Sequence, residues 1–266
     1  EATLVASLNG RLTALRRLVL SDSSKQRSLR HYFYGTDIES KRNLFVKVIF
    51  DERHVAEEVR IQEAARKNTI GRCRIPEIFY HDIKPERSVI AMERILNIQD
   101  VYPQNVKAYA RSLLRSIEAL HACGILHCDI KPLNVLWDGT SVVVVDFGHA
   151  QMIEGARSYS GTPGFTAPEV VNDKIPHSEL SDAYSVGKTL EHVAAEAQML
   201  HDKTLSRIIA GLTTRKVEER WILSNASEEL SPSRVSSVKR QRLEEKGGMD
   251  VITSMELKLP NVAITG

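Results

Sequence analysis

The stretch 125–148 constrains the fold of this chain more than any other part of the sequence. It begins Ile-Leu-His-Cys-Asp-Ile-Lys-Pro-Leu-Asn-Val-Leu and, after a short turn, continues Val-Val-Val-Val-Asp-Phe-Gly. The pattern predicts an apolar strand that ends in a turn with Asp129, Lys131 and Asn134, and a second apolar strand that ends at Asp146. Two carboxylates, an amide and an ammonium group are therefore expected to meet at neighbouring strand ends.

These four side chains together fit phosphoryl transfer. A carboxylate can orient an attacking hydroxyl group, while a second carboxylate and an amide can hold magnesium against phosphates. The spacing His-x-Asp-x-Lys-Pro-x-Asn, followed by Asp-Phe-Gly, resembles the catalytic loop and metal-binding motif of eukaryotic protein kinases. The resemblance covers residues 31–228. It implies an α+β, two-lobed fold, with a small antiparallel β-sheet and one main helix in the N-lobe and a mainly helical C-lobe.

The resemblance implies a role for each polar residue of the stretch. Asp129 would accept a hydrogen bond from the substrate hydroxyl, and Lys131 would neutralise charge on the transferring phosphoryl group. Asn134 and Asp146 would hold Mg²⁺, and Leu136 would lie beneath the adenine ring of ATP. The implied cofactors are ATP and Mg²⁺, and the implied substrate is a serine or threonine hydroxyl of a protein.

A segment further along the chain extends the resemblance. Residues 158–169 end in Ala-Pro-Glu and are similar to the end of an activation segment. Thr162 in this segment and Lys131 form the pair typical of serine/threonine kinases, and the resemblance implies that they meet near Asp129.

Other residues of the second half would serve the scaffold. By the resemblance, Asp182 would hold the backbone of the catalytic loop, and Glu169 would form a buried ion pair with Arg220. His127 is expected to pack beneath Phe147 rather than to act as a base.

The first half of the chain predicts a β-hairpin. Residues 31–35 and 44–50 read as strands with a charged turn between them. Lys47 lies in the second strand among apolar neighbours, and a buried ammonium group needs an anionic partner. The resemblance implies that Lys47 holds the α- and β-phosphates of ATP.

A charged helical pattern at 52–67 would supply a glutamate to Lys47. Three glutamates of this helix compete for that role: Glu57, Glu58 and Glu63. Glu58 is favoured because it shares its helix face with Ile61 and Ala65.

Two further strands are predicted at 75–80 and 88–92. The residues that follow resemble the gatekeeper and hinge of a protein kinase, with Met92 as the gatekeeper. The backbone of Glu93 and Ile95 would then meet the edge of the adenine ring.

The remaining segments complete the expected organisation. Apolar residues recur every three or four positions over 1–20, which predicts a helix, and a polar loop is expected over 21–30. A second periodic segment, 104–123, predicts a buried helix that leads into the catalytic loop. Residues 229–266 form a polar tail, which we expect to be flexible. The expected boundaries are an N-terminal helix and loop at 1–30, an N-lobe at 31–92, a hinge at 93–95, a C-lobe at 96–228 and a tail at 229–266.

Composition narrows the partners. The net charge of +2 gives no reason to expect nucleic acid as a partner. The three cysteines lack metal-ligand spacing and are typical of an intracellular, reduced protein, which we expect to be cytoplasmic with a nuclear location left open. No apolar run predicts a membrane span. The chain begins with Glu1 rather than Met, so we expect a fragment.

Four departures from the kinase pattern limit the resemblance. No Gly-x-Gly-x-x-Gly precedes Lys47, so fewer backbone amides would reach the phosphates. Phe45 stands where a small residue usually roofs the adenine. Cys128 replaces the arginine that usually pairs with a phosphorylated activation segment. Only 38 positions separate Asp182 from Arg220, so we expect the helix that often docks protein substrates to be reduced or absent.

Three functions compete on this reading. An active serine/threonine protein kinase is favoured, because Lys47, Asp129, Asn134 and Asp146 are all present. The second is a pseudokinase that acts as a binding or scaffold module, motivated by the missing glycine loop and by Phe45. The third is a kinase of small molecules, motivated by the short C-lobe and opposed by the Ala-Pro-Glu motif.

Overall fold

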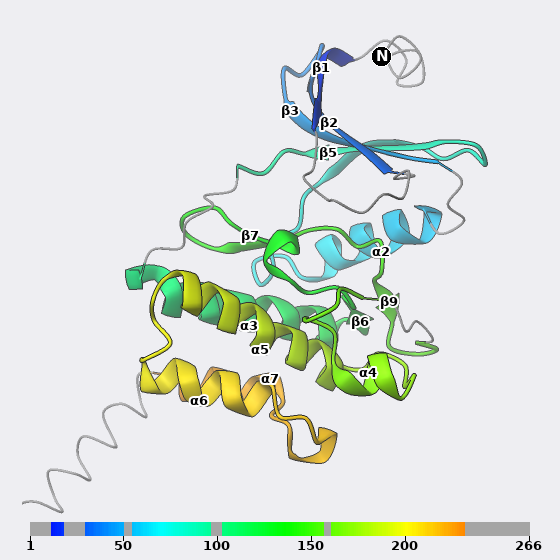
Figure 1. Cartoon of the computed structure of the whole chain (residues 1–266). Coiled ribbons are helices and arrows are strands. Elements are labelled where there is room, and N and C mark those ends of the chain that lie inside the picture. Colours follow the sequence, from blue (N-terminus) through cyan, green and yellow to red (C-terminus); the bar gives the residue numbers. More distant parts are fainter. Residues whose placement is uncertain (1–11, 19–29, 51–54, 97–102, 157–160, 232–266) are drawn as a thin grey trace, which may run out of the picture. The chain divides into compact units, whose positions relative to one another are not determined.

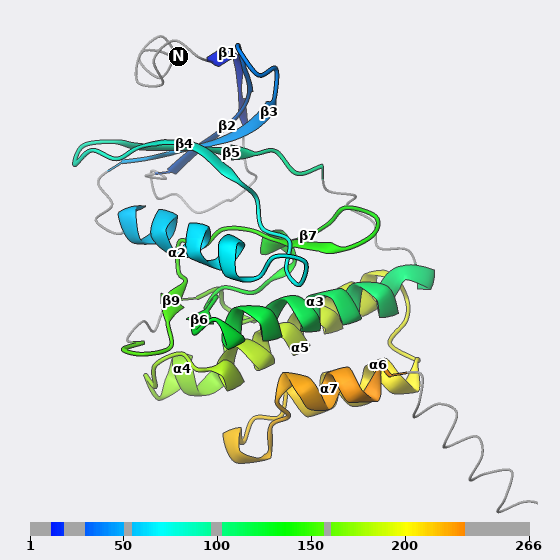
Figure 2. The ribbon, with the colours of Figure 1, turned by 180° about the vertical axis from the view of Figure 1, so that it is seen from behind.

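The structure is a computed structural model, shown from two sides in Figures 1 and 2. The chain divides into two units, Glu1–Leu230 and Ser231–Gly266. Of the second unit only Ser231 is described, so most of the predicted tail lies outside the described residues. The structure describes residues 12–18, 30–50, 55–96, 103–156 and 161–231.

One antiparallel sheet occupies the first part of the chain. Its strands lie in the order β1-β2-β3-β5-β4, and every neighbouring pair is antiparallel. This confirms the small antiparallel sheet and the hairpin expected from the sequence. The strands are β1 (Leu12–Leu18), β2 (Arg30–Asp37), β3 (Asn43–Ile49), β4 (Ile78–Asp82) and β5 (Ser88–Glu93).

The β2–β3 turn is organised by an aspartate. The Asp37 carboxylate accepts the backbone N–H groups of Glu39 at 2.9 Å and Ser40 at 2.8 Å, as aspartates in turns commonly do. Its second oxygen accepts the hydroxyl of Tyr80 at 2.6 Å, which ties the turn to β4. These hydrogen bonds to the ionised form lower the pKa of Asp37 to about 2.

The helix predicted over 1–20 is wrong where the structure describes the chain. Residues Leu12–Leu18 form strand β1, which pairs antiparallel with β2. The edge of β2 offers backbone N–H and C=O groups, and pairing with them satisfies the backbone of this segment. Apolar spacing over so short a run does not separate a helix from a strand. Residues 1–11 and 19–29 lie outside the described residues.

Helix α2 (Val55–Asn68) packs on one face of this sheet. Its Val55 and Val59 form a buried cluster with Ile49 of β3 and with Ile90 and Met92 of β5. Alternate residues of β3 instead face a second cluster, because successive side chains of a strand point to opposite faces. That cluster contains Leu44, Val46, Val48, Val89 and Ala91.

The second part is mainly helical and holds the largest core. Helices α3 (Val106–Ala122) and α5 (Glu179–Glu196) pack side by side, with α6 (Lys203–Leu212) and α7 (Leu223–Glu229) against them (Figures 1 and 2). Apolar side chains of α3 at three- and four-residue spacing enter this core, as the sequence predicts. Ile61 and Ala65, in the middle and the C-terminal part of α2, pack in the same core.

The segments between these helices contain several short helices and strands. Between α5 and Arg220 the described chain has one regular α-helix, the ten-residue α6. This agrees with the short spacing noted in the sequence. The remaining elements are η1 (Pro103–Asn105), β6 (Ile125–Leu126), η2 (Pro132–Asn134), β7 (Val135–Trp137), β8 (Val142–Val144), β9 (Gln151–Met152), α4 (Pro168–Asn172) and η3 (Val217–Glu219).

Candidate active site

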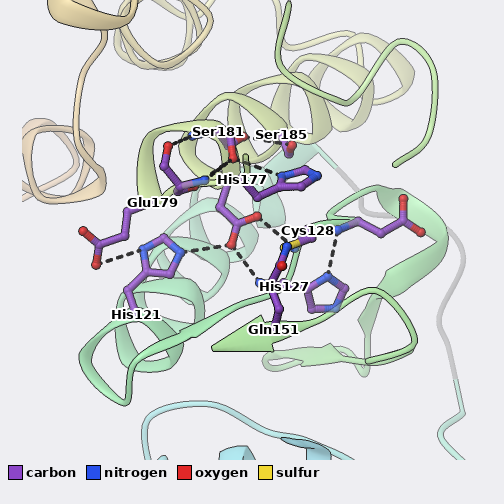
Figure 3. Close-up of polar contacts among 11 residues, drawn as sticks. His121, His127, Cys128, Gln151, His177, Glu179, Ser181 and Ser185 are labelled. Carbon is purple, nitrogen blue, oxygen red and sulfur yellow. Dashed lines mark hydrogen bonds and ion pairs between the residues drawn. The ribbon is translucent and has the colours of Figure 1, made fainter. Parts of the chain in front are cut away.

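The loop between β6 and β7 is held from below by one buried carboxylate. Asp182, in the first turn of α5, accepts the backbone N–H of His127 at 2.9 Å and that of Cys128 at 3.0 Å (Figure 3). Cys128 has a φ of +64°, which is unfavourable for a residue other than glycine. The two hydrogen bonds to Asp182 therefore stabilise a turn that the sequence alone would not favour, and the next residue is Asp129.

Asp182 stays ionised in spite of its burial. Complete burial alone would raise the pKa of Asp182. The hydrogen bond and charge of His121 and the charge and backbone N–H of His127 outweigh burial and hold that pKa below its ordinary value of 3.8. The His121 Nε2 atom lies 3.0 Å from Asp182 Oδ2, and Figure 3 shows the ring reaching it from α3. The stability that this carboxylate contributes is thus present above pH 3.8 and lost only as the pH falls through the lowered pKa.

Asp129 lies at the centre of a compact polar network. Its carboxylate accepts the Thr162 hydroxyl at 2.6 Å and the Lys131 ammonium at 2.8 Å. Lys131 also donates to Thr162 Oγ1 at 2.7 Å. The structure therefore brings together the three residues that the sequence placed in one site, although Thr162 follows Asp129 by 33 positions.

Asn134 joins this network from η2. Its Nδ2 donates to the backbone carbonyl and to the carboxylate of Asp129, both at 2.9 Å. The amide nitrogen is thus committed to Asp129, which leaves the Oδ1 atom as the possible ligand of a cation. Oxygen donors of this kind are what Mg²⁺ prefers.

Lys47 connects the sheet to the second carboxylate of the motif. Its Nζ lies 2.5 Å from Glu58 Oε1 on α2 and 3.0 Å from Asp146 Oδ1. Lys47 and Glu58 are both buried, while the Asp146 side chain is 29% exposed. One carboxylate therefore neutralises the lysine in the interior, and the other reaches the surface where a metal ion could approach.

The structure distinguishes the three glutamates that compete for Lys47. Glu57 is exposed and binds Arg60 of its own helix at 2.6 Å, and Glu63 is exposed. Glu58 alone of the three is buried, and it lies on the helix face that also carries Ile61 and Ala65. The helix-face argument thus selected the glutamate that the structure pairs with Lys47.

The expected adenine region is crowded by aromatic rings. Phe45 lies two residues before Lys47 on β3, and its ring stacks on Tyr32 at 5.7 Å and meets Tyr34 at 6.2 Å. Leu136, on β7, is partly exposed, as are Glu93 at the end of β5 and Ile95 after it. The Glu93 backbone N–H is bonded to the Glu77 carbonyl at 2.8 Å. Contact of the hinge backbone with adenine stays a prediction.

The predicted scaffold contacts are present. Arg220 makes two parallel hydrogen bonds to Glu169, at 2.6 Å and 2.9 Å, and both residues are buried. The His127 ring lies 5.3 Å from the Phe147 ring, and its Nε2 lies 3.1 Å from the Val145 carbonyl. These contacts confirm the predicted buried ion pair and the predicted packing of His127 against Phe147, while the purely structural role of His127 stays a prediction.

Cys128 is a buried thiol rather than a reactive one. Its Sγ accepts a hydrogen bond from Gln151 Nε2 at 3.1 Å (Figure 3). Burial, together with the nearby charge of Asp182, raises the pKa of Cys128 well above its ordinary value. Ligand atoms of Cys128, His177 and Asp182 lie within 4.8 Å of one another. Both oxygens of Asp182 already accept hydrogen bonds, and burial disfavours the thiolate form of Cys128 that a metal ion would bind.

Sequence reasoning missed the contacts of His121 and Gln151. Each lies on an element whose neighbour is distant in the sequence, and neither belongs to a motif. The position of His121 in the last turn of α3, just before the catalytic loop, was the available signal.

A family model for the protein kinase domain matches residues 50–246, most of the chain. The chain belongs to the protein kinase family. The matched segment contains Glu58, Asp129, Asn134 and Asp146. Lys47 lies before the matched segment, and its ion pairs with Glu58 and Asp146 place it in the site.

Curated protein kinases are similar to parts of this kinase chain. Mitogen-activated protein kinase kinase kinase 1a of Physcomitrium patens is 36% identical over 100 residues, covering 36% of this chain and 13% of that protein. Smooth-muscle myosin light chain kinase of Gallus gallus is 40% identical over 85 residues, covering 30% and 4%. Serine/threonine-protein kinase ppk21 of Schizosaccharomyces pombe is 29% identical over 125 residues, covering 42% and 22%. The alignments thus span less than a quarter of each relative's length.

Two further features depend on which residues the structure describes. The segment between β1 and β2, where a glycine-rich loop would lie, falls within residues 19–29 and outside the described residues. In the part of the chain that the structure describes, no helix is both long and apolar enough to cross a membrane.

Proposed function

We propose that the chain is an active serine/threonine protein kinase, which transfers the γ-phosphoryl group of ATP to hydroxyl groups of proteins with the help of Mg²⁺. The observation that carries the proposal is the network in which Asp129 binds Thr162, Lys131 and Asn134 at 2.6–2.9 Å. It gathers a proton acceptor, a cation and an amide around one point, as phosphoryl transfer requires.

Asp129 is the residue that would orient the acceptor hydroxyl. Its Oδ1 already accepts a hydroxyl, that of Thr162, so the carboxylate is positioned for such a contact. The acceptor oxygen would form a bond to the γ-phosphorus as the bond from phosphorus to the β–γ bridging oxygen breaks. The acceptor proton would pass to Asp129, and ADP would leave.

Lys131 and Lys47 would neutralise charge at opposite ends of the triphosphate. Lys131 lies against Asp129 and so next to the phosphoryl group in transfer. Glu58 and Asp146 hold the Lys47 ammonium group on the face of the sheet that packs against α2, and the α- and β-phosphates would bind there. Asn134 and Asp146 would hold Mg²⁺, which would offset the negative charge of the phosphates when bound.

The Thr162 contact and the Glu169–Arg220 pair favour a protein substrate over a small molecule. Both fix residues 161–169 against the catalytic loop and α5, and an extended peptide could lie along this fixed segment beside Asp129. The short chain between α5 and Arg220 limits how much further surface could contact a protein.

A pseudokinase that acts as a binding or scaffold module is the second candidate, and one observation favours it. Phe45 and Tyr32 stack on the face of the sheet that carries Lys47 and extend the apolar cluster beneath it. Rings at this place would narrow the space for adenine. The two candidates therefore differ in whether the nucleotide binds.

The test measures nucleotide binding and acceptor choice on the same protein. Isothermal titration with Mg²⁺ and a non-hydrolysable ATP analogue should give saturable one-to-one binding, and Phe45→Ala should bind at least as tightly. Mg-ATP should then phosphorylate serine and threonine peptides in preference to a matched tyrosine peptide or to a mixture of small metabolites. Absence of binding by both proteins would favour the pseudokinase, and transfer to metabolites alone would favour a small-molecule kinase.

A further inference from the structure

A pocket lies away from the proposed active site, on the side of α3 where two loops approach it. It has a volume of about 590 Å³. One wall is the loop after α2 with Arg72 and Arg74, another is α3 with Arg111 and Arg115, and the third is the β7–β8 turn at 140–142. Figure 2 shows this loop and β7 on the same side of α3. A volume of this size suits a small ligand or a few residues of a peptide.

The pocket carries a strong positive charge. Four arginines line it, and none of the described residues that line it is acidic. Arg74 is neutralised, because it binds Glu93 at 3.0 Å and also pairs with Asp138. Asp138 is in turn fixed by the backbone N–H groups of the β7–β8 turn. The two acidic groups that contact Arg74, Glu93 and Asp138, are thus already bound.

The other three guanidinium groups are available to a ligand. Arg111 and Arg115 lie four positions apart, on one face of α3, and both are exposed. Arg115 donates to the Gly71 carbonyl at 2.9 Å, which holds the loop against the helix and places Arg72 opposite. Among the described residues, Arg72 and Arg111 have no ion-pair partner. Like charges gathered in this way repel one another unless an anion binds between them.

We propose that this pocket binds a phosphorylated serine or threonine side chain of a peptide. A phosphate ester carries a charge of about −1.5 to −2 near pH 7 and offers three acceptor oxygens, which match planar, forked guanidinium donors. Arg72, Arg111 and Arg115 together supply the compensating charge.

The rest of the lining favours a peptide over a nucleotide. Among the described residues that line the pocket none is aromatic, so a nucleobase would lack an aromatic ring on which to stack. The lining instead carries hydroxyl groups beside the arginines, among them Ser112 of α3 and Ser141 of the β7–β8 turn. Ser112 Oγ accepts the Val142 N–H at 3.0 Å and keeps its own proton for a second partner, such as a peptide carbonyl.

The test is fluorescence anisotropy of a labelled hexapeptide, Gly-Ala-phosphoSer-Gly-Ala-Gly, titrated with the full chain. EDTA and the absence of ATP prevent any transfer, so the result does not depend on the proposed kinase activity. The double variant Arg72→Gln/Arg111→Gln should bind the peptide about tenfold more weakly or worse, since it loses two charge-assisted contacts. Arg215→Gln, a change at an exposed arginine outside the pocket, should bind within about twofold of the parent.

Four comparisons make the result decisive. The same peptide with unmodified serine should bind at least about tenfold more weakly than the phosphorylated one, and melting curves should show both variants folded as the parent is. Equal affinity of the parent and the double variant would overturn the site. Displacement by inorganic phosphate or AMP at the same concentration as by the unlabelled phosphopeptide would overturn the peptide as its occupant.

Discussion

Lys47→Met is expected to reduce phosphoryl transfer by about 10²–10³-fold, the loss typical of removing one electrostatic contact from a water-poor site. The lysine Nζ lies between Glu58 and Asp146, at 2.5 Å and 3.0 Å. Methionine fills a similar volume but carries no charge. The substitution would therefore remove the proposed phosphate contact and also the ion pair of Lys47 with Asp146. Initial rates over a range of ATP concentrations would measure the loss.

A matched variant separates this loss from a general effect of removing a lysine. Lys67→Met changes an exposed lysine in the last turn of α2, and its rates should equal those of the parent within about twofold. The Lys47 variant should still show a cooperative melt, because the sheet and α2 keep their apolar cluster. Transfer at the parental rate by Lys47→Met would remove Lys47 from the site.

Glu169→Ala is expected to destabilise the protein by about 3–5 kcal/mol, the cost typical of leaving one member of a buried ion pair without its partner. Arg220 would then keep its charge in the interior without a carboxylate partner, although the carbonyls of Thr214, Leu180 and Arg215 and the ring of Tyr184 remain close by. For a chain of this size the change corresponds to a fall in melting temperature of roughly 6–20 °C. Denaturant unfolding would measure the free energy directly.

The same pair predicts a dependence on pH. Burial alone would raise the pKa of Glu169, but hydrogen bonds and charge from Arg220, with smaller contributions including His177, hold it below its ordinary value of 4.5. The stabilisation is therefore complete above pH 4.5 and is lost as the pH falls through the lowered pKa. Between pH 7 and pH 3 the parent should lose more stability than Glu169→Ala.

Glu219→Ala is the matched control for the stability experiment. Glu219 is exposed and pairs with Lys216 on the surface, so its loss should leave the melting temperature almost unchanged. A Glu169→Ala melt as high as that of this control would contradict the role assigned to the buried pair.

The catalytic loop could be predicted from the sequence because its residues are close in the chain and their spacing is specific. Asp129, Lys131 and Asn134 lie within six positions, and the structure places them in one network. Glu58 could be chosen over Glu57 because helix geometry decides which residues share a face with apolar neighbours.

The first strand could not be predicted, because its structure depends on a partner. The segment Leu12–Leu18 has apolar spacing that suits a short helix, and pairing with β2 decides its conformation instead. The contacts of His121 and Gln151 were out of reach for the same reason. Each joins residues that share no motif and meet only after α3, α5 and the β6–β9 pair have packed.

The neighbours of Phe45 could not be predicted from the sequence. The sequence marks it as an unusual residue next to Lys47, but gives no sign of its neighbours. The structure adds Tyr32 and Tyr34, so the question becomes how three rings share the space above the expected adenine site.

The central claim, that Asp129 directs phosphoryl transfer to protein hydroxyls, has one direct measurement. The parent chain and Asp129→Asn are incubated with Mg²⁺, γ-labelled ATP and a serine-rich acceptor protein. Asparagine keeps the size of the side chain but removes the charge that accepts the proton and binds Lys131. We expect label on the acceptor from the parent and at least about a hundredfold less from the variant. Equal labelling by both proteins, or no labelling by a parent that binds ATP, would contradict the account.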